Sequence, residues 1–538
     1  MGGTVSIFGA TPAAGFFSGR QQEPLPISSR KSMLYAILCL LWIGFGLIGR
    51  DPWKPVEIDF VVIIAEFIGA LPNLPDEASP REIVSLYLLL AATMGWAFFP
   101  LLEIHEGARL INVLMLAGGL VCIGFATRTC HGGRAGWMAA LLAMGTAGFM
   151  IRAHLLNTAV PAFFGMAVLV WAMTRLRRHA LVGGMMVGLA LGFLFVAASP
   201  TVAVAGAVGS GLTLCHHNWR RPSHVIGLAI VPVFFAPWVL LWVPTASMLS
   251  VTTPFYEWLL AGFTPRFSSA VSLLRVAAWA LFPVLPAALA VLWLRRHTLP
   301  KEPMPFFCLT LAVAGFVHFG LYGDGEEDLF LLLPPLAVFA ACGLSRLPDN
   351  YAVILDRFAL GVVGLGAVGG MWIIWLIVQT GFPAALADSI REKIAFFPFP
   401  AVAWWKVVVA ACITLLWVGL AANFDRSNER AVLNWSAGIT ALWSVFNLLA
   451  VDIVDAGKSY RRMAVAVTSG TQSNCFTAQG IDASTLGQLV YFGAPLRTTG
   501  CDYVLQPTAL PSIGTAVWRG GRYSEKNYTL YLPATQTP

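Results

Sequence analysis

Charged residues are scarce in this chain of 538 residues: Asp, Glu, Lys and Arg make up 11%, while 57% of the residues are hydrophobic. Such a composition cannot cover the surface of a soluble globule and is typical of a polytopic membrane protein. The 34 basic residues outnumber the 27 acidic ones, but the excess lies in short gaps between apolar stretches. The net charge therefore gives no reason to expect nucleic acid as a partner.

Three further absences limit the kinds of site and the classes of membrane protein that the sequence allows. None of the nine cysteines has the spacing of a metal site, residues 1–31 contain no cleavable signal pattern, and no internal repeat is visible. The first absence argues against a cysteine-bound metal. The second predicts that the first apolar run is retained as an anchor. The third argues against a transporter, because transporter halves usually repeat.

Basic residues and apolar stretches together predict the topology. Thirteen apolar stretches, most near the roughly 17–25 residues that a spanning helix needs, lie at 33–49, 108–126, 135–151, 159–174, 180–199, 201–215, 223–243, 274–294, 304–321, 329–345, 356–379, 402–422 and 432–450. Basic clusters occupy alternate gaps between them: Arg20/Arg30/Lys31, Arg128/Arg134, Arg175/Arg177/Arg178, Arg220/Arg221, Arg295/Arg296/Lys301, Arg346/Arg357 and Arg426/Arg430. Because positive charge near helix ends stays in the cytoplasm, thirteen crossings place the N-terminus inside and the C-terminal tail outside.

A further apolar stretch, 83–102, would break this alternation if it also crossed the membrane. We therefore expect it to lie along the membrane surface, together with the amphipathic run 57–71, which carries Asp59 and Glu66. The first external loop, residues 50–107, is then a pair of membrane-edge helices. The alternative is that the two runs cross as a hairpin, which also restores the alternation.

The tail, residues 452–538, is predicted to be a small external α/β domain after a membrane domain of residues 1–451. Its expected strands are 489–492, 503–506, 516–518 and 528–532, with a short helix near 481–488. Cys475 and Cys501 are its only cysteines, and an oxidising compartment would join them in a disulfide. We expect such a domain to be structural or to shape an acceptor site.

Ionisable residues at the external ends of spans are the candidates for function, because they are costly at membrane depth. A carboxylate beside an arginine suits transfer from a phosphate-linked donor, since the carboxylate takes a proton from the acceptor and the guanidinium neutralises the leaving phosphate. The external candidates are Glu57, Asp59, Glu82, Tyr87, His154, Asn157, Glu257 and Arg266. The acidic stretch 324–328 offers oxygen ligands for a divalent cation, but it also suits a solvated turn.

Several segments, in this order along nearly the whole chain, resemble the C-type (GT-C) membrane glycosyltransferases, in particular the aminoarabinose-transferase and protein-mannosyltransferase group. The segments are GRDPWKPVE (49–57), REIVSLY (81–87), PLLEIHEGARL (100–110), PFYEW (254–258), PRF (265–267), LLLPP (331–335), NWSAG (434–438) and GKSYR (457–461). The resemblance implies an all-α membrane fold with membrane-edge helices in the first loop. It also implies an undecaprenyl-phosphate-linked sugar as donor, used on the periplasmic face of a bacterial inner membrane.

The catalytic pattern of this group does not carry over intact. The group usually reads Pro-Asp-Glu at residues 55–57, so the position expected to bear the catalytic aspartate is Val56. Glu82 keeps the carboxylate of the group's Glu-Lys pair without the lysine, and Asn157 replaces an aspartate. The lysine expected after the fifth stretch is also missing, whereas Arg266 remains as a phosphate-binding cation.

Two interpretations follow from these departures. In the first, the enzyme is active with a rearranged site: Glu57 or Asp59 is the base, Glu82 orients the acceptor or a cation, Arg266 holds the leaving phosphate, and Tyr87, His154 and Asn157 line the site. In the second, the fold is catalytically silent and binds a polyprenyl lipid or a partner membrane protein. We prefer the first because Arg266 still marks a phosphate pocket. The sugar and the acceptor, whether lipid A, another lipid, a glycan or a protein hydroxyl, stay open.

Overall fold

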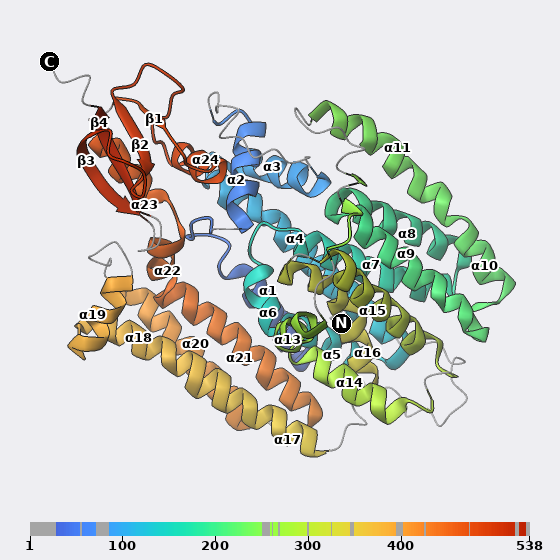
Figure 1. The fold of residues 1–538 in the computed structure, drawn as a ribbon. Helices are drawn as coiled ribbons and strands as arrows, with labels where there is room; N and C mark the ends of the chain where they lie inside the picture. Colours follow the sequence, from blue (N-terminus) through green and yellow to red (C-terminus); the bar gives the residue numbers. More distant parts are fainter. Residues whose placement is uncertain are drawn as a thin grey trace.

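The computed structural model describes residues 28–53, 56–71, 85–249, 259–260, 262–266, 270–298, 301–323, 325–344, 349–393, 402–423, 427–472, 474–521 and 527–533. Each of the thirteen apolar stretches contains helix. In chain order the helices are α1 (Ser29–Gly44), α4 (Ile104–His131), α5 (Gly133–Met144), α6 (Ala147–Arg152), α7 (Ala159–Leu176), α8 (Ala180–Phe193), α9 (Pro200–Gly211), α10 (Pro222–Ala229), α11 (Val231–Leu249), α13 (Ala270–Ala280), α14 (Val284–Arg295), α15 (Pro303–Tyr322), α16 (Leu333–Gly343), α17 (Asp349–Phe358), α18 (Gly369–Thr380), α20 (Trp404–Asn423) and α21 (Asn428–Leu449). A short helix, α19 (Ala384–Lys393), joins α18 to α20. Figure 1 shows these helices in sequence colours.

Fewer continuous spans are present than the thirteen crossings expected. Within the described ranges, eight helices are long and apolar enough to cross a membrane, and a ninth if the bent pair α13 and α14 counts as one span. The other stretches are short or interrupted. Gly145 and Thr146 separate α5 from α6, and Pro283 lies where α13 and α14 meet at 101°. Proline cannot donate the helical hydrogen bond at its position, so a bend there is expected.

The first loop forms two short helices, α2 (Val56–Phe67) and α3 (Leu86–Phe98), of 12 and 13 residues. At 1.5 Å per residue, neither reaches across a hydrocarbon core of about 30 Å. Helix α3 packs on α4, and α2 lies between α3 and the C-terminal helix α24 (Ala483–Tyr491). Their length and packing match membrane-edge helices rather than a transmembrane hairpin.

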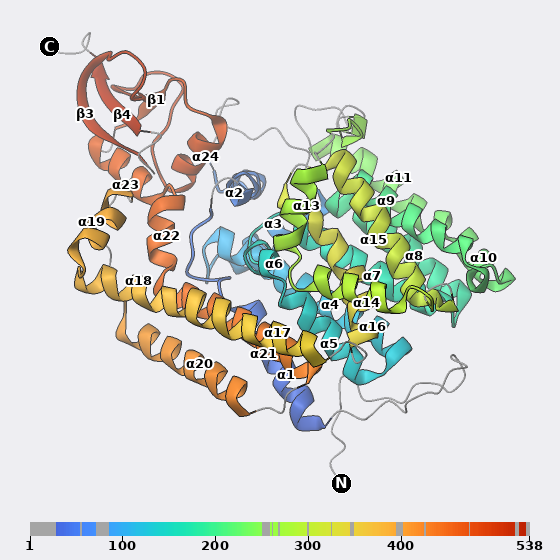
Figure 2. The same cartoon turned by 60° about the horizontal axis from the view of Figure 1, so that its bottom comes forward.

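Close approach of backbones holds the helix bundle together. A Cβ on Gly184 of α8 would lie 1.9 Å from the carbonyl oxygen of Gly227 in α10, so only glycine permits this contact. Away from the bundle, only 17% of the most apolar part of α20 is buried. Figure 2 shows α18 and α20 in an outer layer of the molecule. Exposed apolar side chains on these helices, such as Ile373 and Leu416, suit contact with lipid.

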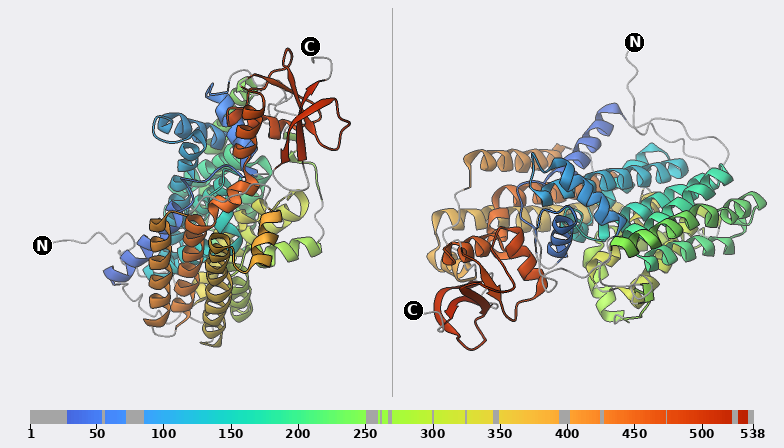
Figure 3. Two further views of the ribbon diagram at one scale, coloured as in Figure 1. Left: turned by 90° about the vertical axis from the view of Figure 1, so that its left-hand side faces the viewer. Right: turned by 90° about the horizontal axis from the view of Figure 1, so that it is seen from above.

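The C-terminal region, residues 451–533, contains α22 (Val451–Lys458), α23 (Arg461–Gly470), α24 and a four-stranded sheet. Its strands are β1 (Phe476–Ala478), β2 (Tyr503–Pro507), β3 (Gly514–Gly521) and β4 (Asn527–Pro533), in the order β1-β2-β4-β3. Strands β1 and β2 are parallel and the other pairs antiparallel. Figure 3 shows the sheet standing at one end of the molecule.

One expected strand of this region is wrong, and one strand was not predicted. Residues 489–491 belong to α24 and Phe492 is its C-cap. The Asp482 side chain accepts a hydrogen bond from the Thr485 amide and starts this helix, whose Leu486 and Leu489 face the core. The parallel strand is instead β1, which contains only three residues. Its pairing with β2 depends on a distant segment, so local pattern does not reveal it.

Cys475 and Cys501 form a disulfide that closes a loop with a sequence separation of 26. Replacing both by serine should lower the stability of the C-terminal region by about 3 kcal/mol, because the unfolded chain gains the entropy of an open loop. Limited proteolysis of the detergent-purified protein should then cut residues 451–533 faster than in the wild type. The exposed free cysteine Cys412 supplies the control: Cys412→Ser should leave the rate unchanged, and equal rates in all three proteins would contradict the prediction.

Candidate functional site

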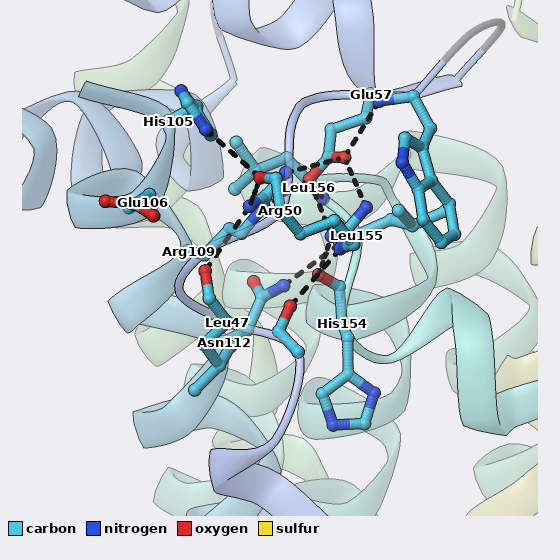
Figure 4. A network of polar contacts seen from close by, with 12 residues as sticks. Leu47, Arg50, Glu57, His105, Glu106, Arg109, Asn112, His154, Leu155 and Leu156 are labelled. Atoms are coloured by element: carbon cyan, nitrogen blue, oxygen red, sulfur yellow. Dashed lines mark hydrogen bonds and ion pairs between the residues drawn. The ribbon is translucent and has the colours of Figure 1, made fainter. Parts of the chain in front are cut away.

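A buried ion triad lies where the first loop meets the bundle. The Glu57 carboxylate, at the start of α2, is held between the guanidinium groups of Arg50 and Arg109, and all three side chains are fully buried (Figure 4). Arg109 reaches both carboxylate oxygens, with Nε to Oε1 at 2.7 Å and Nη2 to Oε2 at 3.0 Å. Arg50 donates from Nη1 to Oε2 at 3.1 Å.

The triad ties distant segments of the chain together. The amides of Trp53 and Leu156 donate to Glu57, each at 3.2 Å. Arg109 also donates to the carbonyl oxygens of Leu47 and Arg50, and Arg50 donates to that of His154 at 3.0 Å. One carboxylate thus links the first loop, α2, α4 and the turn before α7.

The electrostatics keep Glu57 ionised. Burial alone would raise the pKa of its carboxyl group, but the charges of Arg109 and Arg50 outweigh burial and hold that pKa at about 2. A general base needs a pKa near the working pH and a free lone pair. Glu57 has neither in this structure, because both of its oxygens accept hydrogen bonds from arginine side chains and main-chain amides.

The residues that the sequence predicted to line a site are built into the same buried network. The Tyr87 hydroxyl donates to Asn112 at 2.7 Å, and Asn112 donates to the carbonyl oxygen of Leu155. Asn157 lies just before α7, and its Oδ1 accepts from the Ala159 amide at 2.8 Å. Each ring nitrogen of His154 lies 2.7 Å from a carbonyl oxygen. These polar groups surround the triad and are not among the residues that line the cavity beside it.

The remaining predicted site residues have separate positions. Asp59 is half-buried, and its Oδ1 has no hydrogen-bond partner within the described ranges. Glu82 lies outside the described residues, as does Glu257. Arg266 is exposed, and its amide donates to the carbonyl oxygen of Leu321 at the end of α15. The structure therefore does not place Arg266 among the contacts of Glu57.

The acidic stretch after α15 is partly committed to an ion pair. Arg152, at the end of α6, contacts Glu327 at 2.8 Å and Glu326 at 3.7 Å. Asp324 lies outside the part of the chain that the structure describes. Within that part, no group of three or more His, Cys, Asp or Glu side chains is placed to hold a metal ion.

A cavity of about 320 Å³ lies beside the triad. Three segments enclose it: residues 49–51 of the first loop, the start of α4, and α22 with the turn that follows. Its lining residues are Gly49, Arg50, Asp51, Glu103, His105, Glu106, Asp452, Asp455, Ala456, Ser459, Arg461 and Arg462. Three of the sequence segments that carry the family resemblance, 49–57, 100–110 and 457–461, therefore meet at one cavity.

Ion pairs hold the walls of this cavity together. Arg461 donates from Nε to Asp51 at 2.8 Å and from Nη2 to Glu103 at 2.5 Å, so it joins the C-terminal region to the first loop and to α4. The Tyr491 hydroxyl lies 2.8 Å from Nδ1 of His105. Glu106 accepts from the Gly49 amide at 2.6 Å.

Sequence reasoning missed Arg50, Asp455, Arg461 and Arg462 as site residues. Asp455, Arg461 and Arg462 follow the last span and resemble the polar end of a helix. Charge patterning therefore predicts that they face solvent. For Arg50 and Arg461 the order of the family-like segments was a signal, because these residues lie within 49–57 and 457–461. No sequence signal pointed to Asp455 or Arg462.

Comparison with solved structures decides the fold. The chain superimposes on ArnT from Cupriavidus metallidurans bound to undecaprenyl phosphate with a TM-score of 0.65, covering 95% of this chain and 100% of that one at 16% identity. The apo state of the same ArnT gives a TM-score of 0.62, with 93% and 98% covered at 15% identity. The chain has the GT-C fold. No protein-family model and no curated protein matches it.

The likeness in fold extends over 95% of the chain although only 16% of the residues are identical. The triad and the cavity lie where the first loop, α4 and the C-terminal region meet. Membrane insertion follows from the fold and from its long apolar helices.

Glu57→Gln should destabilise the protein by about 3–5 kcal/mol, because it leaves two buried guanidinium groups without a counter-charge. The free energy of unfolding can be measured by titrating the detergent-solubilised protein with sodium dodecyl sulfate. Glu66→Gln is the matched control, since Glu66 is exposed on the same helix, and its change should stay within about 0.5 kcal/mol. A Glu57→Gln protein as stable as the control would contradict the structural role.

Proposed function

We propose that the chain is a membrane glycosyltransferase that moves a sugar from a polyprenyl-phosphate carrier to an acceptor on the outer face of the membrane. The observation that carries the proposal is the likeness in fold, along 95% of the chain, to a transferase structure that holds undecaprenyl phosphate. The polar cavity beside the first loop supports it, because it brings carboxylates and guanidinium groups together at an end of the helix bundle.

In the proposed reaction an acceptor hydroxyl attacks the anomeric carbon of the donor sugar. The bond between that carbon and the phosphate oxygen breaks, the acceptor proton goes to a carboxylate, and polyprenyl phosphate leaves. An arginine that contacts the phosphate stabilises the charge that develops on it. Arg266 is our proposal for this cation, because its side chain is exposed and its main-chain amide is held beside the end of α15 by the carbonyl oxygen of Leu321.

Among the carboxylates named from the sequence, the structure supports different roles. Glu57 is committed to the triad, and we assign it the role of holding the first loop in place. Asp59 is half-buried, and its Oδ1 is buried without a hydrogen-bond partner within the described ranges, so we keep it as a proposal for the first-loop base. Glu82 stays a proposal for orienting the acceptor or a divalent cation.

The same proposal includes a location and an orientation. We place the chain in a bacterial inner membrane with residues 1–451 as the membrane part, the N-terminus in the cytoplasm and residues 452–538 in the periplasm. The alternating basic clusters support this orientation. The disulfide between Cys475 and Cys501 supports it independently, because disulfides persist in the periplasm and not in the cytoplasm.

A second candidate function is a catalytically silent subunit that binds a polyprenyl lipid or a partner membrane protein. One observation favours it: both oxygens of the Glu57 carboxylate are used within the triad, and the preceding residue, where the resembling group has its catalytic aspartate, is valine. This candidate predicts donor binding without turnover.

Turnover separates the two candidates. The purified chain in lipid nanodiscs is incubated with undecaprenyl-phosphate sugars and vesicles of a bacterial envelope lipid extract that contains lipid A, and the release of undecaprenyl phosphate is followed by mass spectrometry. We expect release by the wild type. Arg266→Ala should reduce it by about 100-fold or more, because it removes a charge that stabilises the leaving phosphate.

Arg275→Ala is the matched control, since Arg275 is an exposed arginine on neighbouring α13, and it should release product at the wild-type rate. Saturable donor binding by the wild type without any release would replace the transferase proposal by the silent one. Equal rates for the two arginine variants would remove Arg266 from the site.

A further inference from the structure

Asp455 differs from the other carboxylates of the cavity. Asp51 and Glu103 are paired with Arg461, and Asp452 lies 3.7 Å from Lys406. Asp455 has no cationic side chain within ion-pair distance among the residues described. Its hydrogen-bond donors are neutral: the indole Nε1 of Trp53 at 2.6 Å and the amide of Asp51 at 3.2 Å.

These two donors fix the carboxylate and still leave it able to bind. The Trp53 indole donates to Oδ1 and the Asp51 amide to Oδ2, so each oxygen uses one of its two lone pairs. Because Asp455 lines the cavity, a hydroxyl bound there can donate to a remaining lone pair. Neither donor is flexible, since one belongs to the main chain and the other to a side chain buried against Leu155 and Val451.

We propose that Asp455 is a catalytic residue of the transfer reaction and that the cavity beside the triad is the site of the acceptor, a hydroxyl-bearing carbohydrate head group. This assignment rests on the proposed transferase function. The acceptor hydroxyl gives its proton to a carboxylate oxygen of Asp455 as its own oxygen bonds to the anomeric carbon. The bond from that carbon to the donor phosphate breaks, and polyprenyl phosphate leaves with the electron pair.

The lining of the cavity fits a carbohydrate better than an apolar or a singly charged ligand. Carboxylates of both the first loop and α4 accept hydrogen bonds from hydroxyl groups, and guanidinium groups donate to them. Arg462 lines the cavity and has no ion-pair partner in the described part of the chain, so its donors are available. A volume of about 320 Å³ is at the lower end for ligand pockets, which suits a head group of one or two rings.

The charge environment suits a base that works near neutral pH. Burial, together with the negative charge of Asp51, raises the pKa of Asp455 to about 7. The charged and titratable groups that face it are Arg50 and Asp51 from the first loop, Glu103, His105, Glu106 and Arg109 from α4 and its start, and Asp452, Lys458, Arg461 and Arg462 from its own side. A carboxylate with this pKa is ionised above pH 7 and remains a strong enough base to take a proton.

The test uses the full chain in nanodiscs with an undecaprenyl-phosphate sugar and vesicles of a bacterial envelope lipid extract that contains lipid A. Asp455→Asn should lower kcat by about 100-fold or more, because general-base catalysis contributes at least that much, while donor binding stays unchanged. In the wild type kcat should rise as pH increases through about 7 and then level off, since the base must lose its proton. This rise should be absent in Asp455→Asn and return in Asp455→Glu.

Asp502→Asn is the matched control, because Asp502 is exposed elsewhere in the C-terminal region, and melting temperatures of all variants show whether they fold. No turnover by the wild type would overturn the transferase function and this assignment together. Wild-type turnover with an equally active Asp455→Asn, or with the pH-dependent rise intact in that variant, would overturn this assignment alone. A loss of kcat in Asp59→Asn without a loss in Asp455→Asn would overturn the assignment of Asp455 and make Asp59 the base.

Discussion

The outer face of this protein depends on one carboxylate placed between two guanidinium groups away from water. Glu57 is fully buried, as are Arg50 and Arg109. Taking such charges out of water costs several kcal/mol for each ion, and only short, well-aligned hydrogen bonds offset that cost. Here the bonds also reach the main chain at Leu47, Trp53 and Leu156. The triad therefore fixes the backbone of the first loop and does more than neutralise a charge.

This constraint explains why the C-terminal region forms a wall of the site. Ile58, next to Glu57, belongs to the hydrophobic core of that region together with Met463, Phe476 and Leu530. Arg461 then pairs with the first loop and α4 at the other side of the cavity. Because α2 is anchored in both the bundle and the C-terminal region, a movement of the sheet would move the cavity. The acceptor site that we propose at this junction would give the region after the last span a direct role in the reaction.

Much of the fold was predictable because its cause is local. Hydropathy alone locates helix in every apolar stretch, and the alternation of basic residues argues against a single crossing by residues 83–102. The alternation does not exclude a hairpin of two crossings, which the short lengths of α2 and α3, 12 and 13 residues, argue against. Interruptions such as the bend at Pro283 were not predicted, because a span and a broken pair have the same hydropathy.

The site was harder to predict for a related reason. A glutamate at the edge of the membrane has the same sequence signature whether it is solvated, catalytic or buried between arginines, and Arg50 and Arg109 are 59 positions apart. Asp455 was invisible as a site residue because it meets Asp51 and Trp53 only through the tertiary fold.

The most direct test of this account is a double-mutant cycle on the shortest pair of the triad, with Glu57→Gln, Arg109→Gln and the double variant unfolded under identical detergent conditions. If the triad organises the outer face, the double variant is less destabilised than the sum of the single variants by more than about 1 kcal/mol, because either single change already breaks the pair. Additivity within about 0.5 kcal/mol would show that the two residues act independently and would contradict the account.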